Sequence, residues 1–199
     1  QKFPVATSDP KALDRVALKA NLKGDASKVA VTDGILNLDE STLKFSLNAS
    51  DFSKPNLAFD LNLDRIDADR YLPPKSEQKP AAEKPDQKQA TDYKPLQKLI
   101  LDGRIQIGQL VVNRAKIEDL HLQIKARNGI FNLDPLKLNM YQGNVSGVGS
   151  FDVQTNTPKS SLNLNVENIQ AGPLLRDVLK KDVLEGVTNA NINLAMSGD

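Results

Sequence analysis

Residues 125–134 read KARNGIFNLD, in which an Asn-Gly pair separates two runs of alternating apolar and polar residues. An Asn-Gly pair tolerates the positive φ angles of a two-residue turn, so this pattern is typical of a β-hairpin. Residues 31–39 read VTDGILNLD and repeat the pattern around an Asp-Gly pair. We therefore predict one hairpin turn at Asn128-Gly129 and another at Asp33-Gly34.

The sequences that follow these two turns are also similar to each other. Residues 43–47 (LKFSL) resemble residues 136–140 (LKLNM). Farther along, residues 61–68 (LNLDRIDA) resemble residues 164–171 (LNVENIQA). The chain is therefore predicted to contain one kind of β unit twice.

The composition between these units predicts a three-part organisation. Residues 1–72 form a first, incomplete β unit, and residues 95–199 form a second unit that is truncated at its end. Residues 73–94 are rich in Pro, Lys, Glu and Gln. Such a segment cannot bury enough apolar surface to offset its ordering entropy, so we expect a linker or a long loop.

Apolar residues recur at every second position in nearly all of the extended segments. This period places one side of each strand against an apolar environment and the other side in water. In residues 115–127 the alternation changes parity between Ile117 and Leu120, which predicts a β-bulge at Glu118-Asp119. Gly147 and Gly149 occupy positions of inward-facing side chains, which indicates a bend or the close approach of a neighbour.

Three short segments depart from this alternation and are predicted to be helical. They are residues 67–72, which precede two prolines, residues 95–100, and residues 174–180, which carry an apolar stripe. The fold class that we predict is all-β, with one or more curved antiparallel sheets of repeated hairpins and short capping helices. The sheets form either an open groove or a sandwich-like core, and the alternation does not distinguish these two arrangements.

Composition excludes several classes of function. The 26 Lys and Arg residues balance 25 Asp and Glu residues, so a clustered basic surface for nucleic acid is not expected. The absence of cysteine excludes disulfides and thiolate metal sites, and a single histidine excludes the common zinc sites. No run approaches the ~20 apolar residues of a membrane span. The chain also lacks a signal peptide and is expected to be a segment of a longer protein.

No catalytic constellation can be assembled from these residues. His121 lies between Leu120 and Leu122, hence on the polar side of its strand, where a solvated histidine is the ordinary case. The carboxylates are scattered, and no spacing selects a catalytic pair. Residues 33–39 superficially resemble a calcium loop but lack its ligand spacing and closing Glu. We predict a non-enzymatic protein without cofactor or metal.

The apolar positions of the second unit are the candidate functional residues. If no second layer covers them, they line a continuous apolar surface that acyl chains can occupy. The predicted residues are Leu120, Leu122, Ile124, Phe131, Leu133, Leu136, Leu138, Met140, Leu162 and Leu164.

Several segments, taken in their order, resemble the carboxyl-terminal region of AsmA-type proteins. These are residues 101–108 (LDGRIQIG), 128–136 (NGIFNLDPL) and 141–147 (YQGNVSG), followed by the apolar helix predicted at 174–180. Residues 63–74 (LDRIDADRYLPP) are similar to a recurrent AsmA segment that precedes a variable linker. The resemblance covers most of the chain from Leu13 onward.

The resemblance implies a periplasmic protein of a Gram-negative bacterium, held at the inner membrane by an anchor absent from this chain. AsmA-type proteins contribute to outer-membrane biogenesis, and TamB-like relatives are thought to carry phospholipid along a β-sheet groove. Phospholipid and envelope proteins are the implied partners, and there are no catalytic residues to transfer.

Two other functions remain open from the sequence. One is a structural or docking β module with a closed core, which assists assembly of outer-membrane proteins and binds them by strand addition. The other is a carbohydrate-binding module, which is disfavoured because 5% aromatic residues and no Trp leave few stacking platforms.

Overall fold

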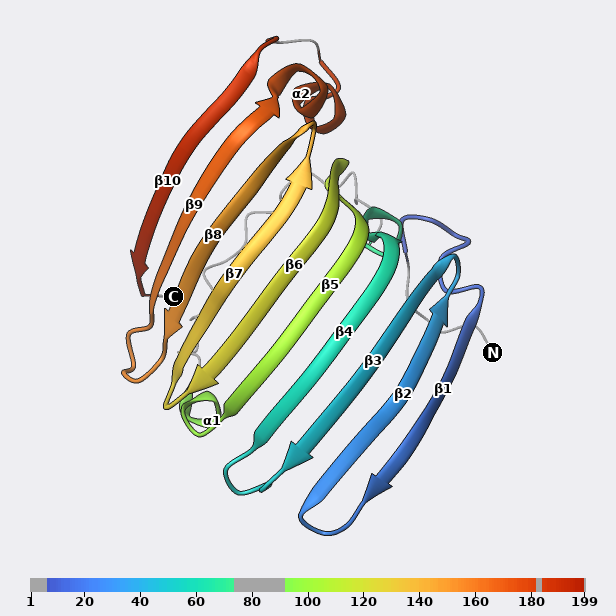
Figure 1. The fold of residues 1–199 in the computed structure, drawn as a ribbon, viewed down its shortest axis with the longest axis vertical. Helices are drawn as coiled ribbons and strands as arrows, with labels where there is room; N and C mark the ends of the chain where they lie inside the picture. The colour runs from blue at the N-terminus through green and yellow to red at the C-terminus, as the bar shows by residue number, and fades with distance from the viewer. Residues whose placement is uncertain (1–6, 74–91, 182–183, 199) are drawn as a thin grey trace, which may run out of the picture.

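The computed structural model describes residues 7–73, 92–181 and 184–198, which form one ten-stranded sheet with its strands in chain order (Figure 1). The strands are β1 (Val16–Gly24), β2 (Lys28–Leu38), β3 (Ser41–Ser50), β4 (Asn56–Asp67), β5 (Ile100–Val112), β6 (Ala115–Arg127), β7 (Ile130–Met140), β8 (Gly143–Asp152), β9 (Lys159–Gln170) and β10 (Val187–Ser197). The short helices are η1 (Ala68–Arg70), α1 (Lys94–Gln97) and α2 (Ala171–Leu179).

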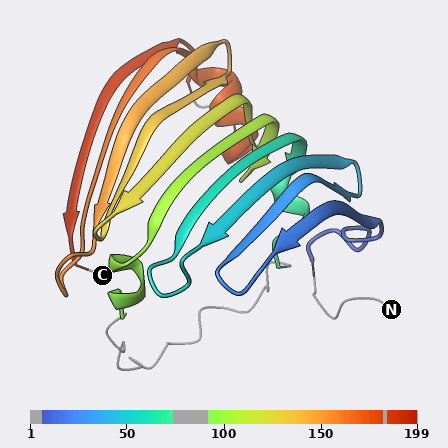
Figure 2. The same cartoon turned by 60° about the horizontal axis from the view of Figure 1, so that its bottom comes forward.

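The strands arch, so that the sheet is curved like a trough (Figure 2). Neighbouring strands are antiparallel, except that β4 and β5 run parallel. This architecture confirms the predicted all-β class. Of the two predicted arrangements, the structure has the open one, because all ten strands belong to a single sheet.

The parallel pair β4–β5 joins the two predicted units into one sheet. Asn56 lies opposite Ile100, and Asp67 lies opposite Val111 at the other end of the pair. The proposed division at residues 73–94 stays a prediction, because residues 74–91 lie outside the described part of the chain. Continuity of the sheet across the β4–β5 pair lets one apolar surface extend over both units.

The three predicted helical segments are confirmed. The Asp67 side chain accepts a hydrogen bond from the Asp69 N–H and so caps η1. α1 has a proline in its first turn, where the missing N–H costs no helical hydrogen bond. α2 begins at Ala171, ahead of the predicted start, and ends at Leu179, followed by Lys180 in the left-handed conformation.

The hairpin turn at Asn128-Gly129 is confirmed, but the one at Asp33-Gly34 is wrong. Asn128 and Gly129 have φ angles of 53° and 77° and connect β6 to β7. Asp33 also has a positive φ, 52°, yet it lies inside β2, where the register with β3 shifts between Val31 and Gly34. A β-bulge and a tight turn can both require a residue with positive φ, so the Asp-Gly dipeptide alone does not distinguish them.

The bulge predicted at Glu118-Asp119 is confirmed. The register between β6 and β7 shifts between Glu118 and His121, and Asp119 has a φ of 50°. Because of this extra residue, Ile117 and Leu120 project to the same face of the sheet although they are three positions apart. The glycine prediction is confirmed as well, because a Cβ atom on Gly147 would lie 2.6 Å from Leu164 Cδ2.

Candidate functional site

One face of the sheet carries aliphatic and aromatic side chains in rows that cross the strands. Residues paired across neighbouring strands project to the same face, so the rows follow directly from the register. One row consists of Gly34, Phe45, Leu61, Ile105, Leu122, Leu136, Gly147, Leu164 and Ile192. The next consists of Leu22, Val31, Leu47, Phe59, Gly103, Ile124, Leu133, Gly149, Leu162 and Leu194. We call this surface the apolar face.

All of the residues predicted from the sequence lie on the apolar face. Leu122 lies opposite Leu136, and Ile124 lies opposite Leu133. Leu162 and Leu164 of β9 continue these rows across the two glycines of β8. Each of the predicted side chains is half-buried, being Leu120, Leu122 and Ile124 of β6, Phe131, Leu133, Leu136, Leu138 and Met140 of β7, and Leu162 and Leu164 of β9.

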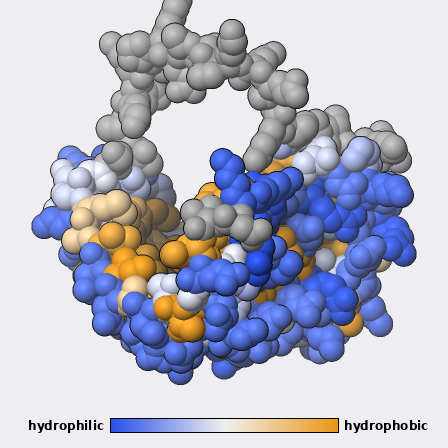
Figure 3. Space-filling model, turned by 90° about the horizontal axis from the view of Figure 1, so that it is seen from above, coloured by the Kyte–Doolittle hydropathy of each residue, from blue (hydrophilic) through white to orange (hydrophobic). Residues whose placement is uncertain are grey.

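The described residues place no second layer of strands over the apolar face. Among the described residues, the fully buried hydrophobic ones are Ala126, Val145, Val153, Ile169 and Ala171, and none of the predicted residues is among them. Figure 3 shows hydrophobic residues gathered in the hollow of the molecule, with hydrophilic residues around its outer side. The side chains of the apolar face are therefore shielded by one another and by the curvature of the sheet.

The prediction covered only the second unit and missed the part of the apolar face formed by the first. Phe45, Leu61 and Ile105 belong to the same row as Leu122. The signal was present, because these strands show the same alternation. What the sequence did not contain was the β4–β5 pairing that aligns the two sets of rows.

Large side chains lie over glycines on the apolar face, which keeps its floor filled. A Cβ atom on Gly34 would lie 2.6 Å from the Phe45 ring, and one on Gly103 would lie still closer to the Phe59 ring. These contacts fill the space over the two glycines within their rows. The apolar face extends from Leu22 of β1 to Leu194 of β10.

The opposite face of the sheet is polar. Asn62 donates to Gln106 Oε1 over 3.0 Å, and Arg104 forms an ion pair of 2.8 Å with Asp60. His121 is exposed on this face, as predicted from its position between two leucines. The two faces thus differ in chemistry, although Ile35 and Val148 also lie on the polar one.

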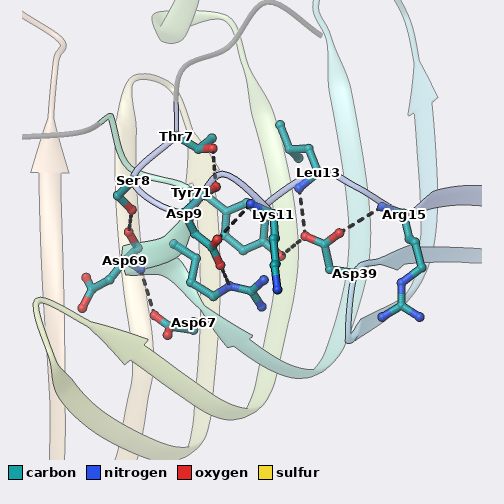
Figure 4. A network of polar contacts seen from close by, with 11 residues as sticks. Thr7, Ser8, Asp9, Lys11, Leu13, Arg15, Asp39, Asp67, Asp69 and Tyr71 are labelled. Atoms are coloured by element: carbon teal, nitrogen blue, oxygen red, sulfur yellow. Dashed lines mark hydrogen bonds and ion pairs between the residues drawn. The ribbon is translucent and has the colours of Figure 1, made fainter. Parts of the chain in front are cut away.

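A polar network fixes the strand ends of the first unit (Figure 4). The Asp39 carboxylate accepts hydrogen bonds from the N–H groups of Leu13 and Arg15 and from the Tyr71 hydroxyl, over 2.9–3.0 Å. Burial and the bond to Asp39 raise the pKa of Tyr71 to about 12. Burial alone would raise the pKa of Asp39, but these three hydrogen bonds outweigh it and lower that pKa.

A second network fixes α2 to the sheet at the same side of the trough. The Tyr141 hydroxyl donates to Asp177 Oδ2 over 2.9 Å, and Lys116 Nζ lies 3.0 Å from the same oxygen. The Lys116 N–H donates to the Tyr141 hydroxyl over 3.1 Å. The hydrogen bond from Lys116, followed by that from Tyr141, lowers the pKa of Asp177.

We expect Asp177→Asn to destabilise the protein at neutral pH but to have no effect at strongly acidic pH. A carboxyl group whose pKa is lowered by folding stabilises the fold above its ordinary pKa, about 3.9, and this contribution is lost as the pH falls through the folded value. Thermal unfolding measured between neutral and acidic pH tests this.

Asp14→Asn is the matched control, because within the described residues the Asp14 carboxylate has no hydrogen bond or ion pair. A constant difference between Asp177→Asn and the unsubstituted protein at every pH would contradict the assignment.

The described residues contain no group of three His, Asp or Glu side chains that could hold a metal ion. Their helices are all too short or too polar to cross a bilayer. The described residues thus form a long apolar surface between polar strand ends.

Comparison with known proteins gives one match. The sequence model described as AsmA family matches residues 5–199, nearly the whole chain. The curated proteins and the solved structures that were searched gave no match.

Proposed function

Because the chain belongs to the AsmA family, which is associated with the bacterial envelope, we propose that it holds or conducts phospholipid acyl chains along the apolar face. It does so in the periplasm, as part of outer-membrane biogenesis and without catalysing a reaction. In the full-length protein an anchor keeps it at the inner membrane.

The observation that carries this proposal is that the described strands leave the apolar rows of the sheet without a second layer over them. Ten strands define nine intervals of ~4.8 Å, so the rows extend over about 43 Å. The hydrocarbon core of a whole bilayer is only ~30 Å thick, so the surface accommodates more than one acyl chain end to end. Each CH₂ group that leaves water on this surface contributes about 0.8 kcal/mol. Large exposed apolar surfaces are rare in soluble domains unless they bind something.

The absence of Trp from the sequence allows a background-free test of where lipid lies. We expect the fluorescence of a Phe45→Trp variant to be quenched by phospholipid with brominated acyl chains, because Phe45 belongs to the apolar face. Lys44→Trp is the matched control, because Lys44 is the neighbouring residue on the exposed polar face. Equal quenching of the two variants, or none of either, contradicts the proposal.

A second candidate function is protein docking at the β10 edge of the sheet. Exposed edge strands usually carry charges that prevent pairing with other chains. β1 carries Lys19 and Lys23, whereas β10 has no charged residue in 11 positions and exposes Leu194 and Met196. Such an edge can accept a strand of another protein. A docking role differs from lipid binding in that it does not require the apolar face to be free of charge.

A further inference from the structure

The corner where α2 ends and β10 begins exposes several aliphatic side chains. Leu179 is 51% exposed, Leu184 62% and Val187 56%. The Ala171 N–H donates to the Gly186 carbonyl over 2.9 Å, which holds the segment before β10 against the start of α2. Figure 1 shows α2 beside the start of β10. These three side chains therefore share one end of the trough.

α2 is held rigidly in this position. Asp177 is bound by Lys116 and Tyr141, and Ala171 and Gly172 at the start of the helix are buried. Leu174, Leu175 and Val178 are half-buried, whereas Leu179 is exposed at the last position of the helix. The helix thus cannot turn Leu179 inward without breaking the contacts of Asp177.

Two lysines follow the exposed leucine directly. Lys180 and Lys181 are both exposed, and neither has a carboxylate within 4 Å among the described residues. Glu185 is also exposed in this region, and residues 182–183 lie outside the described part of the chain. Aliphatic side chains flanked by lysines are typical of surfaces that bind the interface of a bilayer with anionic lipids.

We propose that this corner, defined by Leu179, Lys180, Lys181, Leu184 and Val187, contacts the surface of a bilayer that contains anionic phospholipid. The aliphatic side chains enter the boundary between head groups and acyl chains, and the lysines bind phosphate. This inference rests on the proposed lipid-binding function, because the contact would deliver lipid to the apolar face at its β10 end.

The register of β10 supports this route. Val187 pairs with Gln170 at the corner and, by the alternation of β10, projects to the opposite face, whereas Ala190, Ile192 and Leu194 continue along the strand in the rows of the apolar face. An acyl chain that leaves the bilayer at the corner therefore meets Thr188 first on that face, and aliphatic side chains from Ala190 onward.

Flotation with lipid vesicles tests the contact. We expect the protein to float with vesicles of phosphatidylcholine mixed with phosphatidylglycerol, and less with phosphatidylcholine alone. The double variant Leu179→Ser/Leu184→Ser should lose at least about tenfold in vesicle binding, because both large aliphatic side chains that enter the bilayer interface are removed. Lys180→Glu/Lys181→Glu should remove the preference for the anionic vesicles.

Phe52→Ser is the matched control, because Phe52 is 55% exposed at the opposite ends of the strands, in the β3–β4 turn. The proposal is overturned if wild-type protein does not float, if the leucine variant floats like wild type, or if Phe52→Ser reduces flotation as much. Circular dichroism verifies that the variants are folded.

The two proposals fail in different ways. In the Phe45→Trp background, brominated phospholipid delivered from detergent reaches the apolar face without a bilayer. Corner variants that lose flotation but remain quenched support the contact. Absence of quenching with flotation intact would contradict lipid binding by the apolar face. The flotation result would still support the membrane contact.

Discussion

Leu122→Asp is expected to reduce the phospholipid that copurifies with the protein about tenfold, while the sheet remains folded. Leu122 lies at the centre of a row, between Ile105 of β5 and Leu136 of β7. A carboxylate there removes the contribution of one leucine, roughly 1.5–3 kcal/mol. It stays hydrated because none of the strands that the structure describes forms a second layer over it. A phospholipid acyl chain that lies along this row must pass the charge.

The adjacent substitution His121→Asp is the matched control. It introduces a carboxylate on the same strand but on the polar face, where His121 is exposed. Mass spectrometry of organic extracts from gently purified protein measures the lipid, and circular dichroism measures the thermal unfolding temperature. Unfolding of Leu122→Asp would show that Leu122 belongs to a closed core, and unchanged lipid content would contradict the proposed binding surface.

Gly143→Ala is expected to lower the free energy of unfolding by about 1–3 kcal/mol, the usual cost of overpacking. A Cβ atom on Gly143 would lie 2.5 Å from the Asn168 carbonyl carbon and from the Ile169 nitrogen. These are main-chain atoms of β9 immediately before α2, so relief requires movement of the strand that carries the helix. Urea unfolding followed by circular dichroism measures the loss.

Gly149→Ala on the same strand is the matched control. Its Cβ atom would lie 3.2 Å from the Ser161 carbonyl oxygen and 3.4 Å from Leu162 Cδ1, so a small adjustment accommodates it. We expect its effect to remain below about 1 kcal/mol, since little overpacking is introduced. Equal stability of the two variants would show that β9 does not constrain Gly143.

The sequence by itself determined which residues share a face. Backbone geometry makes side chains alternate along a strand, so the apolar positions of β6, β7 and β9 could be assigned to one surface from local spacing. The bulge at Glu118-Asp119, the turn at Asn128-Gly129 and the three short helices also follow from local signals. Each of these features depends on residues that are neighbours in sequence.

The tertiary structure decided the rest, because it depends on contacts between residues far apart in the chain. Asp33-Gly34 has the chemistry of a turn, but pairing with β3 keeps it within β2 as a bulge. The parallel pairing of β4 with β5 unites two repeated units in one sheet, and Asp39 meets Tyr71 across 32 positions. Whether another layer covers an apolar face depends on the path of all other strands, and alternation within each strand is the same in either case. Only the assembled sheet shows that, within the described part of the chain, this face is open.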